Sequence, residues 1–456
     1  MSQKVSVVFG TTQSDIETFV NNSSGDYSAV IVDSNVQFVV KEVAAEKQSL
    51  EKVRMIAGNI ARDVKQRKIE NIYVNEQKLQ TFFEKLDGRK VVTAFVEGWQ
   101  LGAYQFDTYK TNKTKAAKLT FINEAAVKKE VTEGNIRAAA TAFSRDLMNE
   151  IPSTLNPETF PTILQEEFAE TDVDVIVHDK AALEKMEMNG LLAVNRGSKY
   201  DPAFIELHYE GDASKPLVAL VGKGVTFDTG GISLKSGRDL SDMRMDMGGA
   251  AAVAGAVKLL AEANADVNVV GLIQTVENMP DKHSILPGDI ITYKNGKTVQ
   301  VGNTDAEGRL ILADGLIRAG ELNATYIVDI ATLTGAIARA LGPKMGGIFG
   351  EEDLMAEMKQ VGEESGDFVW PMPLVEAYDE TLKSDYADFK NISNQGEGGA
   401  ITAALFLRRF VPENAKWLHV DMAGVMESKQ SGYYGNTATG FGARLLADYA
   451  NYVSKK

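Results

Sequence analysis

Short apolar runs alternate with helical patterns in the first part of the chain. Runs rich in β-branched residues at 5–9, 29–32 and 91–95 predict strands. Apolar residues recur with helical spacing over 46–66 and 76–86, which predicts two helices. Strands and helices in alternation predict a small α/β domain at the N-terminal end.

A turn-rich stretch at 97–112 leads to a helical pattern from about 124 to 149. Pro152 and Pro157 come soon after this helix and favour a change of element. A chain of 456 residues also exceeds the size at which one hydrophobic core usually stops growing. We therefore predict three parts: an N-terminal α/β domain over 1–125, a connecting helix over 126–150 and a larger domain over 151–456.

The larger domain has apolar runs that are typical of fully buried strands, at 217–221, 267–274 and 326–330. Helical stretches begin after Met247, Arg309 and Thr334. Strands separated by helices predict a mostly parallel sheet that is covered by helices on both faces.

One hairpin interrupts this alternation. Residues 294–297 read Lys-Asn-Gly-Lys between apolar runs at 290–292 and 298–301, and Asn-Gly predicts a two-residue hairpin turn. The second run of the hairpin leads directly into the charged string Asn-Thr-Asp-Ala-Glu-Gly-Arg-Leu at 303–310.

Composition narrows the possible functions. The formal net charge of -15 disfavours binding to the phosphate backbone of a nucleic acid. The absence of cysteine removes thiolate nucleophiles and Cys-based zinc sites, and it is compatible with a reducing cytosol. No signal peptide and no apolar run of about twenty residues is visible, so we expect a cytoplasmic protein without a membrane span.

Two segments place charged residues where a buried strand ends. The first runs over 221–235 and continues to 249, and the second is the string at 303–310. Open α/β sheets bind ligands at the carboxyl ends of their strands. In the second segment an extended backbone would point Asp305, Glu307 and Arg309 to one face. Gly302 and Gly308 would let the backbone bend closely around a bound group.

Oxygen-rich ligands in a chain without cysteine favour Mg, Mn or Zn. The four histidines lie outside both segments, which argues against a His-ligated zinc hydrolase.

Each charged residue also has an ordinary structural interpretation when it is taken alone. Gly222-Lys223-Gly224 is compatible with a simple turn, and Asp228 with a turn or cap residue. Asp246 is compatible with a helix start. The alternating charges at 305–309 are compatible with a solvated strand face that holds an ion pair.

Taken together and in this order, the two segments resemble the leucine aminopeptidase (cytosol aminopeptidase) family. The resemblance extends from Arg145 to the C-terminus and includes 331–336 and 419–424, whereas the first part matches only around 97–98 and 101–102. Thr229 stands where the family more often has serine, and Ser236 where proline is common. The family releases N-terminal residues, leucine and other apolar ones preferentially, from peptides.

The resemblance implies a role for each charged residue. Asp228 and Glu307 would bridge two divalent cations, Asp305 would complete one cation site, and Lys223 and Asp246 would complete the other. Four carboxylates balance two divalent cations if Lys223 binds as a neutral amine. Water bridging the cations would be the nucleophile.

Lys235 and Arg309 would then face the reacting peptide. Lys235 would stabilise the oxyanion, and Arg309 matches the position that holds a bicarbonate ion in the family. The residues that match the family's side-chain pocket are Met243, Thr332, Gly335, Ala423 and Met426. For the two methionines, plain core packing is the alternative interpretation.

The resemblance also implies a homohexamer that acts on peptide substrates. Two alternatives remain at this point: a DNA-binding regulatory protein, since some family members bind DNA, and another two-metal hydrolase such as a phosphatase.

Overall fold

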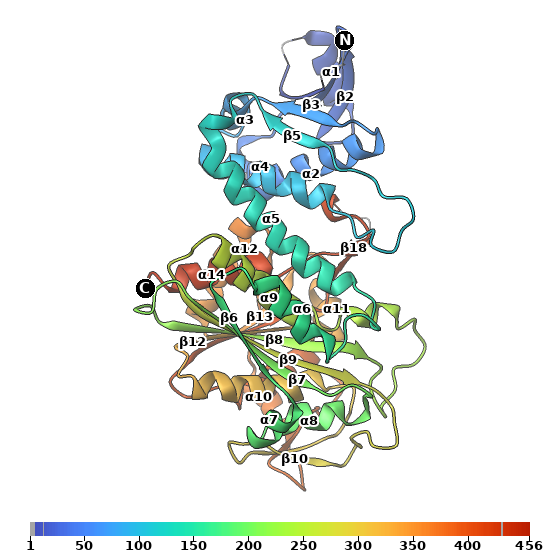
Figure 1. The fold of residues 1–456 in the computed structure, drawn as a ribbon, viewed down its shortest axis with the longest axis vertical. Coiled ribbons are helices and arrows are strands. Elements are labelled where there is room, and N and C mark those ends of the chain that lie inside the picture. The colour runs from blue at the N-terminus through green and yellow to red at the C-terminus, as the bar shows by residue number, and fades with distance from the viewer. Residues whose placement is uncertain (1–4, 12, 430–431) are drawn as a thin grey trace. The chain divides into compact units, whose positions relative to one another are not determined.

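The computed structural model describes residues 5–11, 13–429 and 432–456, and the chain forms two compact units (Figure 1). Unit 1 contains Met1–Ala142 and Ser428–Thr437, and unit 2 contains Phe143–Glu427 and Ala438–Lys456. Helix α5 (Lys128–Asn149) runs through the stretch predicted as a connecting helix. The predicted boundaries of the domains themselves stay a prediction.

Unit 1 is built on a five-stranded sheet with the order β2-β3-β1-β4-β5. Strand β2 is antiparallel to β3, and the other neighbours are parallel. The strands are β1 (Ser6–Phe9), β2 (Tyr27–Val32), β3 (Asn35–Val40), β4 (Asn71–Val74) and β5 (Lys118–Phe121). The helices are α1 (Ser14–Asn22), α2 (Leu50–Gln66), α3 (Glu76–Phe82) and α4 (Gly88–Ala103). This arrangement confirms the predicted α/β unit.

The strand predicted at 91–95 is wrong, because these residues lie inside helix α4. Asp87 caps the helix by accepting hydrogen bonds from the backbone N–H groups of Arg89 and Lys90. Almost every residue from 91 to 102 is buried, so the apolar residues show no helical period. A continuous apolar run does not distinguish a strand from a fully buried helix. The turn predicted from residue 97 onward accordingly begins only after Ala103.

Helices α2 and α4 approach each other through glycines. A Cβ atom at Gly98 would lie 2.3 Å from the backbone oxygen of Arg54, and one at Gly102 would lie 2.2 Å from that of Gly58. The two helix backbones therefore touch directly, and no side chain fits between them.

Replacing Gly98 with alanine is expected to lower the free energy of unfolding by about 1–3 kcal/mol, because the added methyl group overpacks the contact. This loss exceeds the gain in helix propensity of about 1 kcal/mol. Gly396→Ala is the control, since a Cβ atom there meets open space at an ordinary backbone conformation. Urea unfolding of the two variants measures the difference, and equal stability would contradict the close contact.

Unit 2 contains an eight-stranded sheet with the order β14-β13-β16-β12-β8-β9-β7-β6. The four central strands, β16, β12, β8 and β9, are parallel. Antiparallel pairs join β13 to one side of this centre and β7 and β6 to the other. The strands are β6 (Val173–His178), β7 (Ala203–Glu210), β8 (Leu217–Asp228), β9 (Asn268–Asn278), β12 (Tyr326–Ala331), β13 (Gly346–Gly350), β14 (Val369–Pro371) and β16 (Lys416–Asp421).

Helices cover both faces of this sheet, as predicted (Figure 1). Helix α9 packs on the central strands from one side, and α14 packs against α9. Helix α12 packs against α14 and directly on the strands β13, β14 and β16. Helix α10 packs on the strands β8, β9 and β12 from the other side, where α8 packs on β9 and α13 packs against α10. The helices are α6 (Thr159–Phe168), α7 (Lys180–Lys185), α8 (Asn189–Val194), α9 (Gly248–Glu262), α10 (Gly308–Glu321), α11 (Gly335–Leu341), α12 (Glu352–Ser365), α13 (Gly399–Arg408) and α14 (Ala443–Val453).

The predicted hairpin is present as β10 (Ile290–Thr292) and β11 (Thr298–Gln300), with β15 (Phe389–Lys390) parallel to β11. Its turn is longer than the predicted two residues. The Tyr293 oxygen accepts a hydrogen bond from Gly296 N at 2.8 Å, and Tyr293 N donates to the Lys297 oxygen at 2.9 Å. Gly296 has a φ of 84°, so a turn followed by a left-handed glycine closes the hairpin over three residues.

The short pair β17 (Glu427–Ser428) and β18 (Thr437–Ala438) stands where the chain passes between the two units. Among the described residues, no helix is long and apolar enough to cross a membrane.

Candidate metal centre

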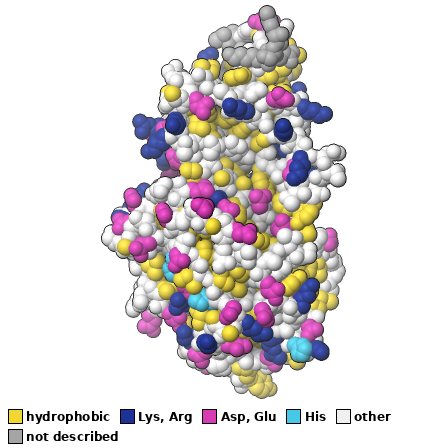
Figure 2. All heavy atoms as spheres, viewed as in Figure 1, with side chains coloured by type: hydrophobic (Ala, Val, Ile, Leu, Met, Phe, Trp, Pro, Cys, Tyr) yellow, Lys and Arg dark blue, Asp and Glu magenta, His cyan; other side chains and the backbone are white. Residues whose placement is uncertain are grey.

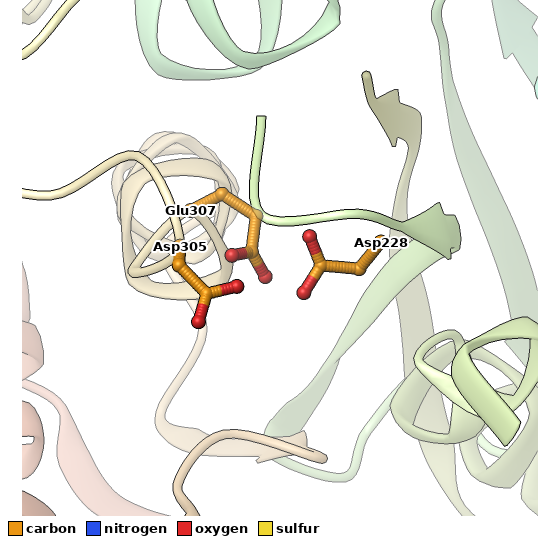
Figure 3. Close-up of side chains that lie close together, drawn as sticks. All are labelled: Asp228, Asp305 and Glu307. Atoms are coloured by element: carbon orange, nitrogen blue, oxygen red, sulfur yellow. The ribbon is translucent and has the colours of Figure 1, made fainter. Parts of the chain in front are cut away.

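Three carboxylates converge at the carboxyl edge of the parallel strands. Asp228 is the last residue of β8, while Asp305 and Glu307 come from the turn that precedes α10. Figure 3 shows the three side chains pointing toward one another. One oxygen of each carboxylate lies within 4.8 Å of the others. Segments about 80 residues apart in the sequence are thus brought together by the sheet topology.

Lys223 lies inside strand β8 and is buried, so the Gly222-Lys223-Gly224 turn is excluded. Its Nζ atom is 2.8 Å from Glu307 Oε1 and 2.8 Å from Asp246 Oδ2. The side chain passes over Gly308, where a Cβ atom would lie 2.8 Å from the lysine Cδ and Cε atoms. Gly308 therefore allows a close approach, as predicted, but the group that approaches is a lysine stem.

Asp246 precedes α9, yet its carboxylate does not cap that helix. Instead it contacts Lys223 and accepts a hydrogen bond from Thr332 Oγ1 at 2.8 Å. The Thr332 carbonyl in turn accepts from Lys223 Nζ at 3.1 Å. Asp246 is therefore part of the charged cluster and not an ordinary helix-start residue.

Lys235 contacts the other half of the cluster. Its Nζ atom is 2.7 Å from Asp228 Oδ2 and 2.5 Å from Asp305 Oδ1. Asp228 also accepts a hydrogen bond from Gly230 N at 2.9 Å, so it closes the local turn as well. Each lysine thus bridges two of the four carboxylates.

The cluster holds two ammonium groups and four carboxyl groups, so it has two negative charges in excess when all four carboxyl groups are ionised. Burial alone lowers the pKa of Lys223, but Asp246, Glu307 and Asp228 outweigh this and raise it above its ordinary value. The pKa of Glu307 is also raised, because burial and the charge of Asp228 outweigh the lysines. Excess negative charge that is buried favours a bound cation.

The donor set fits divalent cations. Glu307 Oε2 is buried and has no hydrogen-bond partner among the described residues, which is costly unless another group binds it. Carboxylate oxygens suit Mn, Mg and Zn, and the Lys223 nitrogen can become a ligand only when a bound cation displaces its proton. The residues that could hold such ions are Lys223, Asp228, Asp246, Asp305 and Glu307.

The backbone of the string 303–310 is not extended, which corrects the sequence prediction. Glu307 is helical, with φ -76° and ψ -35°, and α10 begins at Gly308. Asp305 and Glu307 still converge on Asp228, whereas the Arg309 guanidinium donates to the Asn391 oxygen at 2.8 Å. The charges meet because a turn passes into a helix, and not because alternate residues share a strand face.

Arg309 is buried, and its Nε atom has no hydrogen-bond partner within the described part of the chain. Burial lowers the pKa of Arg309 to about 10, although Glu307 and Asp421 act in the opposite direction. The guanidinium therefore stays charged at neutral pH and keeps an N–H group available for an anion.

Asn278, which sequence reasoning missed, joins the two halves of the centre. It is the last residue of β9 and lies opposite Asp228 in the parallel register. Its Nδ2 atom donates to Asp228 Oδ1 at 2.8 Å and to the Thr304 oxygen at 3.0 Å. A polar residue at the end of a buried strand was the available signal, but its partners depend on the strand order.

Hydrogen bonds link only some of the predicted pocket residues to the charged cluster or to one another's segments. Asp421, at the end of β16, accepts hydrogen bonds from the N–H groups of Leu333, Thr334 and Ala423 at 3.2–3.3 Å. This carboxylate orders the chain around Thr332 and next to Gly335. Met243 is buried near Asp246, and Met426 is half-buried, so their place in a pocket stays a prediction.

Comparisons with known proteins match nearly the whole chain to one protein family. Family models match residues 142–447 with the catalytic domain and residues 44–113 with the N-terminal domain of the cytosol aminopeptidase family. A probable cytosol aminopeptidase of Persephonella marina is 39% identical over 413 residues, which covers 88% of this chain and 82% of the relative. A probable cytosol aminopeptidase of Chlorobium limicola is 41% identical over 420 residues, which covers 87% of this chain and 82% of the relative.

Solved structures of the bottromycin maturation enzyme BotP share the fold. One covers 100% of both chains with a TM-score of 0.89 and 30% identity. Its complex with Mn covers 99% of this chain and 100% of that chain, with a TM-score of 0.90 and 30% identity.

Proposed function

The chain belongs to the cytosol aminopeptidase family, and from this membership we propose how it carries out the metal-dependent release of N-terminal residues from peptides. The observation that carries the proposal is the convergence of Asp228, Asp305 and Glu307 within 4.8 Å.

We assign two divalent cations to this centre. Asp228 and Glu307 would contribute to both cation sites, Asp305 would complete one site, and Lys223 and Asp246 would complete the other. Support comes from the partnerless Glu307 Oε2 atom and from the excess negative charge of the cluster. The Mn complex of the similar enzyme BotP favours Mn, with Zn or Mg as alternatives.

When bound, the two cations supply the Lewis acidity that activates water for attack on a peptide carbonyl. The loaded centre would hold the free N-terminal amino group of the peptide, so that only the first peptide bond would reach the nucleophile. Lys235 donates to the oxyanion that develops on the scissile carbonyl. Arg309 holds an anion, for which bicarbonate is the candidate, through its free N–H group.

We propose that Met243, Thr332, Gly335, Ala423 and Met426 receive the side chain of the N-terminal residue. Their apolar character favours leucine or methionine over charged residues. The position of Thr332, bonded to Asp246, supports a pocket directly beside the cations.

We also place the enzyme in the cytoplasm as a homohexamer, in keeping with the family. Acidic and basic side chains are interspersed on the face shown in Figure 2, and the net charge is -15. Neither feature favours DNA binding, and the comparisons lend no support to that alternative. Membership of a peptidase family likewise replaces the phosphatase alternative.

Turnover of leucyl anilide is expected to require metal, because the nucleophile depends on the cations. Chelation should abolish activity, and Mn or Zn should restore it. A panel of N-terminal residues, with metal analysis and size measurement of the active enzyme, tests the remaining assignments. Turnover that resists chelation would exclude the two-cation centre.

A further inference from the structure

The loop at 302–306 has no helix or strand, yet it carries Asp305 and leads into Glu307. Within the loop, Asp305 N donates to Asn303 Oδ1 at 2.8 Å, and Ala306 N contacts the Asn303 oxygen at 3.3 Å. These local bonds are few for a segment that positions two carboxylates. The geometry of the centre therefore depends on hydrogen bonds between this loop and other parts of the chain.

One side chain, Asn391, makes four hydrogen bonds to the backbone of this loop. Its Oδ1 atom accepts from Gly302 N at 2.7 Å and from Asn303 N at 3.3 Å. Its Nδ2 atom donates to the Asn303 oxygen at 2.7 Å and to the Ala306 oxygen at 3.2 Å. Two donors and two acceptor positions are the full capacity of an asparagine amide.

Asn391 is itself held firmly. It is fully buried and follows strand β15, whose parallel register with β11 continues as Asn391 N donates to the Gln300 oxygen at 3.1 Å. The amide is therefore fixed by the sheet on which the loop begins. A buried amide that uses all its hydrogen bonds has one orientation.

The backbone oxygen of Asn391 reaches the other part of the centre. It accepts the hydrogen bond from Arg309 Nη1 at 2.8 Å. One residue thus fixes the loop that carries Asp305 and also orients the guanidinium that follows Glu307.

We propose that Asn391 is a positioning residue that holds Asp305, Glu307 and Arg309 in the geometry required for cation binding and turnover. The proposal rests on the proposed function, because it presumes that this centre binds divalent cations. Residues that orient metal ligands typically change metal affinity by about 10- to 100-fold when they are replaced.

Replacing asparagine with leucine, a residue of similar size, separates the positioning role of Asn391 from its role in packing. Asn391→Leu keeps the volume and removes all four side-chain bonds. Asn156→Leu is the matched control, since Asn156 is also buried and its side chain bonds only backbone groups near the start of α6. Its Oδ1 atom accepts from Glu158 N at 3.0 Å and from Thr159 N at 3.2 Å. Both variants lose buried hydrogen bonds, but only Asn391→Leu loses hydrogen bonds to the loop at 302–306.

The experiment measures the dissociation constant of the folded full-length protein for Mn²⁺ by calorimetry, together with kcat and KM for leucyl anilide. Asn391→Leu is expected to weaken Mn²⁺ binding by about 10- to 100-fold and to lower kcat more than it changes KM. Asn156→Leu is expected to bind Mn²⁺ like the parent.

Parental Mn²⁺ affinity in folded Asn391→Leu would overturn the inference, and so would equal losses in both variants. If Asn391→Leu fails to fold, the smaller Asn391→Ser takes its place, and parental affinity there has the same meaning. Failure of the parent to bind Mn²⁺ would contradict the proposed function instead, so the two failures are distinguishable.

Discussion

Glu307→Gln is expected to lower kcat/KM for leucyl anilide by about a thousandfold. The substitution keeps the size of the side chain but replaces a charged oxygen ligand with an amide. Lewis-acid activation is worth several kcal/mol, here taken as about 4 kcal/mol, and each 1.36 kcal/mol corresponds to about a tenfold change in rate. The variant changes a proposed ligand whose Oε2 atom is buried and has no hydrogen-bond partner among the described residues.

Loss of the metal should accompany the loss of turnover. The parent is expected to melt at a higher temperature when Mn²⁺ is added, because a ligand that binds only the folded state stabilises it. Glu307→Gln should lose most of this shift. Metal content, melting temperature and turnover are measured on the same preparations.

Glu277→Gln provides the control. Glu277 is buried next to Asn278, but its carboxylate accepts from Ser198 Oγ at 2.6 Å and lies outside the cluster. We expect turnover close to that of the parent in this variant. A Glu307→Gln enzyme that keeps both turnover and the Mn²⁺ shift would show that the cluster is not the catalytic centre.

The sequence predicted the sheet of unit 2 well, because its strands carry a strong local signal. The runs at 217–221 and 326–330 lie within β8 and β12, and the run at 267–274 lies within β9 except for its first residue. Helices begin directly after Met247 and Thr334, whereas α10 begins at Gly308, one residue before Arg309. The run at 91–95 carries the same local signal and is helical. Burial on all sides removes the period that would tell the two structures apart.

The charged residues could be found in the sequence, but their arrangement could not. Alternation of Asp305, Glu307 and Arg309 suggested an extended strand, whereas a turn and a helix start bring the first two together. The position of Asn278 at the end of a buried strand was a weak local signal, and no local pattern marks Asn391. Their importance follows from strand neighbours that lie far away in the sequence, at β8 and β11.

Lys235 and Glu307 lie in one cluster, but we expect Lys235 to act on the substrate and Glu307 to bind the cations. Burial lowers the pKa of Lys235, but Asp228, Glu307 and Asp246 outweigh this and raise it above its ordinary value. Lys235 is therefore an ammonium at neutral pH, suited to stabilise an oxyanion and unsuited to act as a general base.

Lys235→Met is expected to lower kcat by about a hundredfold to a thousandfold, the usual cost of losing one oxyanion donor. Methionine keeps the length of the stem without the charge. Because this change removes a positive charge from among four carboxylates, Mn²⁺ affinity should be retained or increased.

Steady-state kinetics and Mn²⁺ titration together separate the two roles. Arg238→Met is the control, since Arg238 belongs to the same segment but is more exposed and pairs with Asp242. It should resemble the parent in both measurements. A Lys235→Met enzyme that loses Mn²⁺ binding along with turnover would place Lys235 among the metal-site residues, whereas loss of turnover alone supports action on the substrate.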